Sequence, residues 1–156
     1  MSMDEIVIFE RDMTPAELAR MHAGFDENAS DHGVEPQHSQ RFGLVALVGV
    51  RFVGCISGLA YTNGEQFSGW FYLTDLFVEK EYRLKGIGAH LLQTLEQNLL
   101  QHRIHQIWTW TAGYEAPGFY QAHGYEVFVE MENWYPNGAS RVGLRKSISQ
   151  HGKKSS

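Results

Sequence analysis

Residues 83–89 read Arg-Leu-Lys-Gly-Ile-Gly-Ala and join an apolar, strand-like run, residues 70–78, to a helix-like run, residues 89–101. Two glycines in such a turn let the backbone approach an anion closely, because no Cβ covers the converging N–H groups. The helix that follows offers unpaired N–H groups and the positive end of its dipole. Arg83 and Lys85 add formal positive charge. This layout predicts a site for a cofactor that carries a diphosphate.

Two common phosphate-binding motifs do not fit this turn. The dinucleotide fingerprint requires Gly or Ala three positions after its second glycine, and that position is Leu91. The P-loop requires Gly-Lys followed by Ser or Thr, and the chain has no such triplet. What remains is Arg-x-x-Gly-x-Gly followed by Ala89.

A second pattern begins about thirty residues later, at Pro117, and reads Phe-Tyr-x-x-x-Gly-Tyr over residues 119–125. Proline suits the first turn of a helix, and Gly124 suits the left-handed position just after a helix ends. Strand-like runs flank this segment. The sequence therefore predicts a short helix that carries Tyr120 between two strands.

In this order and spacing, the two motifs resemble the hallmarks of the GNAT superfamily of acetyl-CoA-dependent N-acetyltransferases. The resemblance covers nearly the whole chain and is strongest over residues 70–125. It implies an acyltransferase that uses acetyl-CoA as co-substrate and no metal. Tyr120 matches the tyrosine that, in this family, gives a proton to the departing thiolate or shares one with it. One departure is Gly113, where relatives often carry an asparagine that contacts the pantetheine arm.

The resemblance also assigns the cofactor contacts. The strand before the glycine turn would offer backbone groups to the pantetheine arm, as an added strand does. The N–H groups of the turn would hold the pyrophosphate, with the two basic side chains as charge support. The residues implied are Leu76, Phe77, Val78, Arg83, Leu84, Lys85, Gly86, Ile87, Gly88 and Ala89.

Several groups are candidates for taking the proton from the amine. Asp75 is the only carboxylate in the strand before the turn, where many relatives place one. Because strand side chains alternate, either Asp75 or the hydroxyl pair Tyr72 and Thr74 faces the acceptor. Asp75 could also be structural, and a water chain, Glu27, Glu65 or a histidine could serve instead.

The acceptor is predicted only as a small-molecule or peptide amine. An acidic cluster in residues 26–35 favours a cationic amine electrostatically, although a solvated acidic loop is an equal reading. Aromatic side chains in residues 70–72 and 134–135 could form one wall of the site for the acceptor amine. They could equally belong to the hydrophobic core or to a homodimer surface. The alternative function is a non-catalytic acyl-CoA-binding module with the same fold.

Composition agrees with one soluble domain. The chain has 156 residues, 43% hydrophobic, with a net charge of −5 and no basic stripe, which argues against nucleic acid. Cys55 is the single cysteine and is expected to be a buried, inert thiol, and the eight histidines lack metal-ligand spacing. With no apolar run of membrane length and no signal peptide, a cytoplasmic protein without membrane contact is expected. We expect a single domain over residues 1–148 and a flexible tail over residues 149–156.

The elements that must position these residues are strands and helices in mixed order. Thr14, Pro15 and Glu17 predict a helix start, and this helix is expected to end near Phe25. A loop with a short helix is expected over residues 26–40. The fold class is therefore mixed α/β: the GNAT fold, a central, mostly antiparallel sheet flanked by helices. Strands are expected at residues 6–10, 42–50, 52–61, 70–78, 104–111, 125–131 and 140–146.

Overall fold

The computed structural model describes residues 4–149 and divides into two units, Met1–Pro36 and Gln37–Ser156. The first unit contains helix α1 (Pro15–Asp31). The predicted capping box is present: Thr14 Oγ1 accepts from the Glu17 N–H at 3.2 Å, and Glu17 Oε1 accepts from the Thr14 N–H at 2.7 Å. The helix continues six residues past Phe25, so the expected break and second short helix are absent from residues 26–40.

The strand predicted at residues 6–10 is wrong, because these residues are exposed and adopt no regular secondary structure. A strand is stabilised by its hydrogen-bonded neighbours. The described residues of the first unit contain no second strand that could pair with this one. The predicted tail falls, from residue 150 onward, outside the described residues. No described helix is long and apolar enough to cross a membrane. The single domain and the cytoplasmic location stay predictions.

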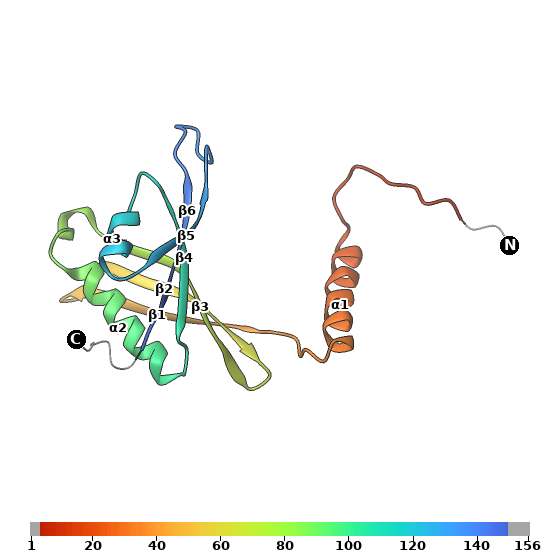
Figure 1. The fold of residues 1–156 in the computed structure, drawn as a ribbon, viewed down its shortest axis with the longest axis horizontal. Coiled ribbons are helices and arrows are strands. Elements are labelled where there is room, and N and C mark those ends of the chain that lie inside the picture. The colour runs from red at the N-terminus through yellow and green to blue at the C-terminus, as the bar shows by residue number, and fades with distance from the viewer. Residues whose placement is uncertain (1–3, 150–156) are drawn as a thin grey trace. The chain divides into compact units, whose positions relative to one another are not determined.

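The second unit is built on a six-stranded mixed sheet in the order β1-β2-β3-β4-β6-β5 (Figure 1). The β3–β4 pair is parallel, and the other four pairs are antiparallel. This arrangement confirms the predicted mixed fold with a mostly antiparallel sheet. The strands are β1 (Ser39–Val48), β2 (Arg51–Asn63), β3 (Gln66–Val78), β4 (Gln106–Ala112), β5 (Glu126–Met131) and β6 (Arg141–Ser147).

Helices α2 (Ile87–Gln101) and α3 (Pro117–Ala122) contribute to one core with the sheet, and a short 3₁₀ turn, η1 (Lys80–Tyr82), precedes α2. The predicted leucine stripe of α2 is confirmed as buried. It packs in one cluster with Phe71, Ile107 and Tyr120, so α2 and α3 cover the same face of the sheet (Figure 1). The stripe consists of Leu91, Leu92, Leu95 and Leu99.

A β-bulge in β3 changes which side chains face this core. Asp75 pairs with Ser57 and Leu73 pairs with Gly58, so Thr74 is an extra residue between two consecutive pairs. Leu73 is buried in the core, and Leu76 packs against it, although simple alternation would place these two on opposite faces. The bulge therefore puts Asp75 on the face that α2 and α3 do not cover.

The parallel pairing between β3 and β4 ends at Leu73 and Thr109, although both strands continue beyond this pair. The Thr109 hydroxyl donates to the Leu73 carbonyl at 2.9 Å, and Thr109 is almost fully buried. Past this point, residues 74–78 keep β2 on one side but pair with no described strand on the other. The interior of the sheet therefore contains an open strand edge.

Candidate functional site

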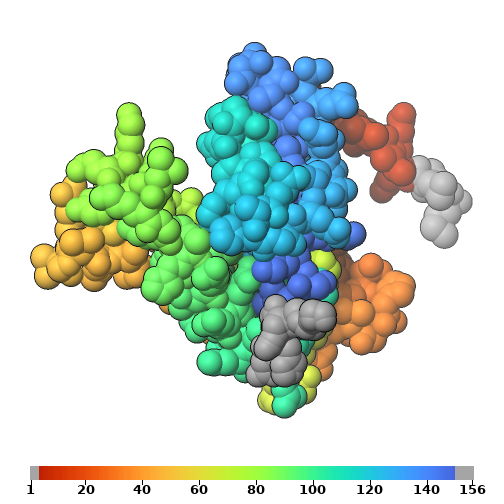
Figure 2. All heavy atoms as spheres, turned by 60° about the vertical axis from the view of Figure 1, so that its left-hand side comes forward, coloured from red at the N-terminus to blue at the C-terminus, as the bar shows by residue number. Residues whose placement is uncertain are grey.

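A cavity of about 970 Å³ lies where β3 and β4 separate. Its walls come from the ends of both strands, the turn before α2, the first turn of α2, and α3. Figure 2 shows a deep notch between the green surface, near residue 80, and the cyan surface, residues 110–120. The loss of strand pairing thus creates a cavity rather than a packed seam.

Nine of the ten predicted cofactor residues line this cavity, and the exception is Lys85. The Lys85 ammonium lies 5.3 Å from the centre of the Tyr82 ring, a cation–π distance. The residues that line it are Leu76, Phe77, Val78, Arg83, Leu84, Gly86, Ile87, Gly88 and Ala89.

The turn has the backbone form that an anion site requires. Gly86 has φ of 81° and occupies the N-cap of α2 without any side-chain cap, so the first N–H groups of the helix are open to a ligand. Leu84 also has a positive φ, 61°, and its side chain is fully exposed. A non-glycine residue in this conformation stores backbone strain, which is commonly concentrated at binding sites.

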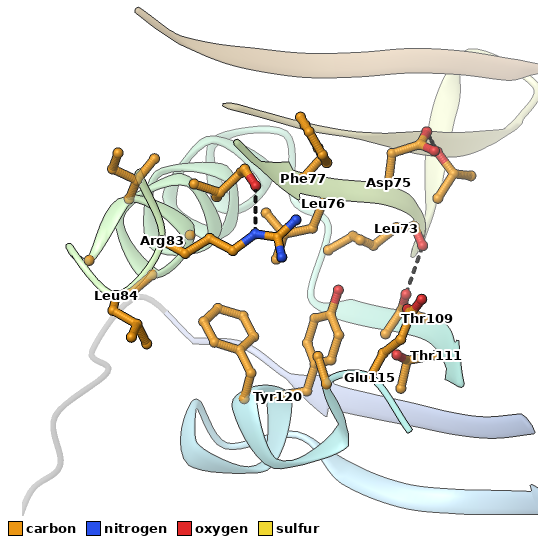
Figure 3. A pocket seen from close by; sticks show the side chains of 18 of the residues that line it. Leu73, Asp75, Leu76, Phe77, Arg83, Leu84, Thr109, Thr111, Glu115 and Tyr120 are labelled. Carbon is orange, nitrogen blue, oxygen red and sulfur yellow. Dashed lines mark hydrogen bonds between the residues drawn. The ribbon is translucent and has the colours of Figure 1, made fainter. Parts of the chain in front are cut away.

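Arg83 connects the turn to the strand. Its Nε donates to the Val78 carbonyl at 2.9 Å. Figure 3 shows the guanidinium lying in the cavity, between β3 and the helix that carries Tyr120. Because Nε holds the strand end, the terminal nitrogens remain available for an anion.

Tyr120 is a buried polar group that lines the cavity. It is 5% exposed, and Figure 3 shows its hydroxyl pointing toward the strand ends. Burial raises the pKa of Tyr120 to about 12; the nearby Thr109 hydroxyl opposes this shift, and the charge of Glu115 adds to it. At neutral pH the phenol therefore keeps its proton and can donate a hydrogen bond.

Sequence reasoning missed Thr109 and Glu115, which also line the cavity. Thr109 lies in a mostly apolar strand, and its place in the cavity wall follows only from its pairing with Leu73, which the sequence does not give. Glu115 comes from the loop between β4 and α3, and Figure 3 shows it beside the two threonines of β4. A loop carboxylate gives no sequence signal of its own.

Asp75 lines the cavity, but its carboxylate is already engaged. Oδ2 accepts from the Thr74 hydroxyl at 2.7 Å and lies 3.9 Å from Arg41 Nη1. Arg41 also donates to Ser57 Oγ at 2.9 Å. In Figure 3 Asp75 extends away from Tyr120. This polar network ties β1, β2 and β3 together.

Other candidates lie elsewhere. Glu27 pairs with Arg20 at 3.0 Å within α1 of the first unit, and Glu65 is exposed in the β2–β3 turn, outside the cavity lining. Cys55 is half-buried, and burial together with Asp75 raises the pKa of its thiol, which keeps it protonated. Within residues 4–149 no three metal-binding side chains cluster.

Comparison with known proteins decides the family. A model described as the acetyltransferase (GNAT) domain matches residues 39–127, more than half of the chain. The chain belongs to this family. A search of curated proteins finds no match.

Solved structures with the same fold include an acetyltransferase from Bacillus cereus ATCC 14579, which is 21% identical with a TM-score of 0.73 over 90% of this chain and 98% of that one. An aminoglycoside 6′-N-acetyltransferase complexed with coenzyme A is 18% identical, with a TM-score of 0.58; the match covers 70% of this chain and 74% of that one. A ribosomal-protein-alanine N-acetyltransferase from Brucella melitensis is 20% identical, with a TM-score of 0.56; the match covers 86% of this chain and 81% of that one. The last two names differ in the acceptor, so the shared fold leaves the acceptor open.

In this GNAT protein a partly buried hydrogen-bond network contacts Tyr120 through Tyr125. The Tyr120 and Tyr125 rings meet edge to face at 5.4 Å, and the Tyr125 N–H donates to the Tyr120 carbonyl at 3.0 Å. The Tyr125 hydroxyl donates to Glu96 at 2.8 Å, and Lys146 donates to the other carboxylate oxygen at 2.9 Å. The side chains of Glu96 and Lys146 are 13% and 24% exposed. This network joins α2, β6 and the segment that follows α3.

We predict that Glu96→Gln lowers the free energy of unfolding by about 1–3 kcal/mol, because it leaves the partly buried Lys146 charge without its counterion. Urea denaturation followed by circular dichroism measures the change. Glu126→Gln is the matched control, because Glu126 forms an exposed ion pair with Arg145 at 3.3 Å and should change stability by less than about 0.5 kcal/mol. Equal effects of the two substitutions would contradict a stabilising role for the network.

Proposed function

We propose that this protein transfers an acetyl group from acetyl-CoA to a primary amine by direct attack of the amine on the thioester. One observation carries the proposal: a single cavity combines an open strand edge, a glycine turn at a helix N-terminus and a buried tyrosine. The aminoglycoside N-acetyltransferase with the same fold is complexed with coenzyme A, which supports this cofactor class.

Each part of the cofactor has a matching surface. The pantetheine arm contains two amides, which can pair with the backbone of Leu76, Phe77 and Val78 as an added strand would. The pyrophosphate suits the N–H groups at the start of α2 and the terminal nitrogens of Arg83. The thioester would then lie near Tyr120, at the point where β3 and β4 diverge.

The reaction moves one acyl group and one proton. The neutral amine nitrogen forms a bond to the thioester carbon, the carbon–sulfur bond breaks, and the proton lost by nitrogen balances the proton gained by sulfur. A phenol with a pKa of about 12 is a weaker acid than a thiol with a pKa of about 8.5, so full transfer would cost roughly 5 kcal/mol. Tyr120 therefore acts mainly by hydrogen bonding to the thiolate as negative charge develops on sulfur.

The acceptor side has two carboxylates. We retain Asp75 as the proposed group that positions or deprotonates the amine, because it lines the cavity. Glu115 is the second candidate, because its charge acts on Tyr120, whereas the Asp75 carboxylate is engaged by Thr74. A water molecule between carboxylate and amine fits either assignment.

We predict that Gly88→Val weakens acetyl-CoA binding at least about tenfold while the fold is kept. Gly88 lies in the first turn of α2, and a Cβ there would stand 3.6 Å from the Phe119 ring. Both residues line the cavity, so the valine side chain would occupy cavity space. Calorimetric titration measures the affinity, and thermal unfolding checks the fold. A folded variant with unchanged affinity would remove the turn from the cofactor site.

Tyr120→Phe should lower kcat by roughly 10²- to 10³-fold, the usual cost of losing one hydrogen-bond donor to developing charge, because the ring stays and the donor is lost. The affinity for acetyl-CoA should change little. The matched control is Tyr114→Phe, which removes a hydroxyl from an exposed residue of the same cavity. A CoA-release assay over a panel of amines provides the rates. Normal turnover in Tyr120→Phe would reduce Tyr120 to a packing residue.

The two carboxylates can be separated by paired substitutions. If Asp75 deprotonates the amine, Asp75→Asn lowers kcat/KM at neutral pH and alters the acidic limb of the pH–rate profile, whereas Glu115→Gln does neither. If Asp75 only binds the ammonium group, KM rises and the profile keeps its shape. The reverse pattern transfers the role to Glu115. Binding of acetyl-CoA without turnover of any amine would instead support the acyl-CoA-binding module.

A further inference from the structure

The sheet face opposite α2 and α3 carries a row of aromatic rings that reaches the cavity. Tyr72 and Trp108 stack at 4.2 Å, and Trp108 meets Trp110 edge to face at 5.8 Å. Trp110 itself belongs to the cavity lining. The row therefore connects this face of the sheet to the proposed reaction centre.

Arg141 lies at the cavity end of this row. Its guanidinium carbon is 4.8 Å from the centre of the Trp110 ring and 5.1 Å from that of Trp134. Within residues 4–149 no carboxylate pairs with it and no group accepts a hydrogen bond from its guanidinium. Arg145, four residues further along the same strand, differs because its Nε donates a hydrogen bond to Glu126 at 3.3 Å.

Two aromatic contacts hold a guanidinium in place without using its in-plane donors. A planar guanidinium placed in this way keeps its fork of N–H groups for a carboxylate, which it can bind in bidentate fashion. Its rotamer freedom is already reduced by the two indole rings, so less entropy is lost when an anion binds. The geometry is that of a preformed carboxylate site.

The position of Arg141 relates this site to the reaction. Arg141 is the β6 partner of Ala112, three residues beyond Thr109 on β4. Thr109 adjoins Tyr120, and three strand residues span roughly 10 Å. Asp75 and Glu115 also line the cavity, and their carboxylates suit an ammonium group.

We propose that Arg141 binds a carboxylate of the acceptor, so that the acceptor class is a dipolar amine with its carboxylate roughly 10 Å from the reactive nitrogen. This inference rests on the proposed acetyl transfer, and the carboxylate takes no part in bond making or breaking. A free amino carboxylic acid and a peptide C-terminus both supply the group.

The experiment compares acceptors that differ only in the carboxylate. The pairs are 6-aminohexanoate with 6-aminohexanamide, and triglycine with triglycinamide. Wild-type kcat/KM should favour each carboxylate by about tenfold or more, as expected for a charged hydrogen bond. Arg141→Gln should bring both ratios close to one, with unchanged affinity for acetyl-CoA. Arg141→Lys should restore them only in part, because an ammonium lacks the planar fork.

Arg145→Gln is the matched control, because it removes the same charge from the same strand and should leave both ratios intact. Tryptophan fluorescence titration of the four compounds without acetyl-CoA supplies a readout that needs no turnover. Absence of a carboxylate preference in the wild type, or a preference that survives Arg141→Gln or disappears equally in Arg145→Gln, would overturn the inference. Thermal unfolding separates this outcome from a purely structural contact between Arg141 and Trp134.

If no amine is acetylated, the proposed function fails, and the fluorescence ratios alone decide the role of Arg141. If amines are acetylated without regard to the carboxylate, the proposed function stands and Arg141 has another role. A preference seen only with the triglycine pair identifies a peptide C-terminus, and one seen only with the aminohexanoate pair identifies a free amino acid.

Discussion

The central constraint in this structure is the point at which two parallel strands stop pairing. β3 and β4 share hydrogen bonds as far as Leu73 and Thr109, and the Thr109 hydroxyl occupies the Leu73 carbonyl there. Beyond this pair both strands continue, held by β2 on one side and β6 on the other. An open edge would be a liability at the border of a sheet, but here it lines a cavity in which we propose that the pantetheine arm binds.

The elements around this point are arranged to keep the gap open. α2 anchors β3 through its buried leucines, while α3 and the Tyr125–Glu96–Lys146 network hold the opposite wall. Because the network crosses between α2 and β6, the separation of the walls depends on hydrogen bonds between charged groups as well as on apolar packing. Such bonds impose a defined geometry, whereas apolar contacts tolerate small displacements.

Much of this could be predicted from the sequence, because the signals are local. The glycine turn, the leucine stripe and the short helix at Pro117 each depend on a few adjacent residues. The face of Asp75 could not be predicted, because the bulge at Thr74 is visible only in the pairing with β2. Glu115 and Arg141 were missed for the same reason, because each is recognised as a candidate only from the residues that lie near it in the fold: Tyr120 for Glu115 and Trp110 for Arg141. The strand expected at residues 6–10 does not form because a strand needs a hydrogen-bonded neighbour, and residues 4–36, the described part of the first unit, contain none.

The double contact of Arg83 has a consequence for how this site can vary. Nε donates a hydrogen bond to the end of β3, while the terminal nitrogens of the same guanidinium face the cavity. The position of the strand end and the position of the guanidinium are therefore linked. A lysine would keep the charge but has a single nitrogen, and it could serve the strand or an anion, not both. The two halves of the proposed cofactor surface are therefore coupled through Arg83: a displacement of the strand end would draw the guanidinium away from the turn, and an anion bound in the turn would pull on the strand.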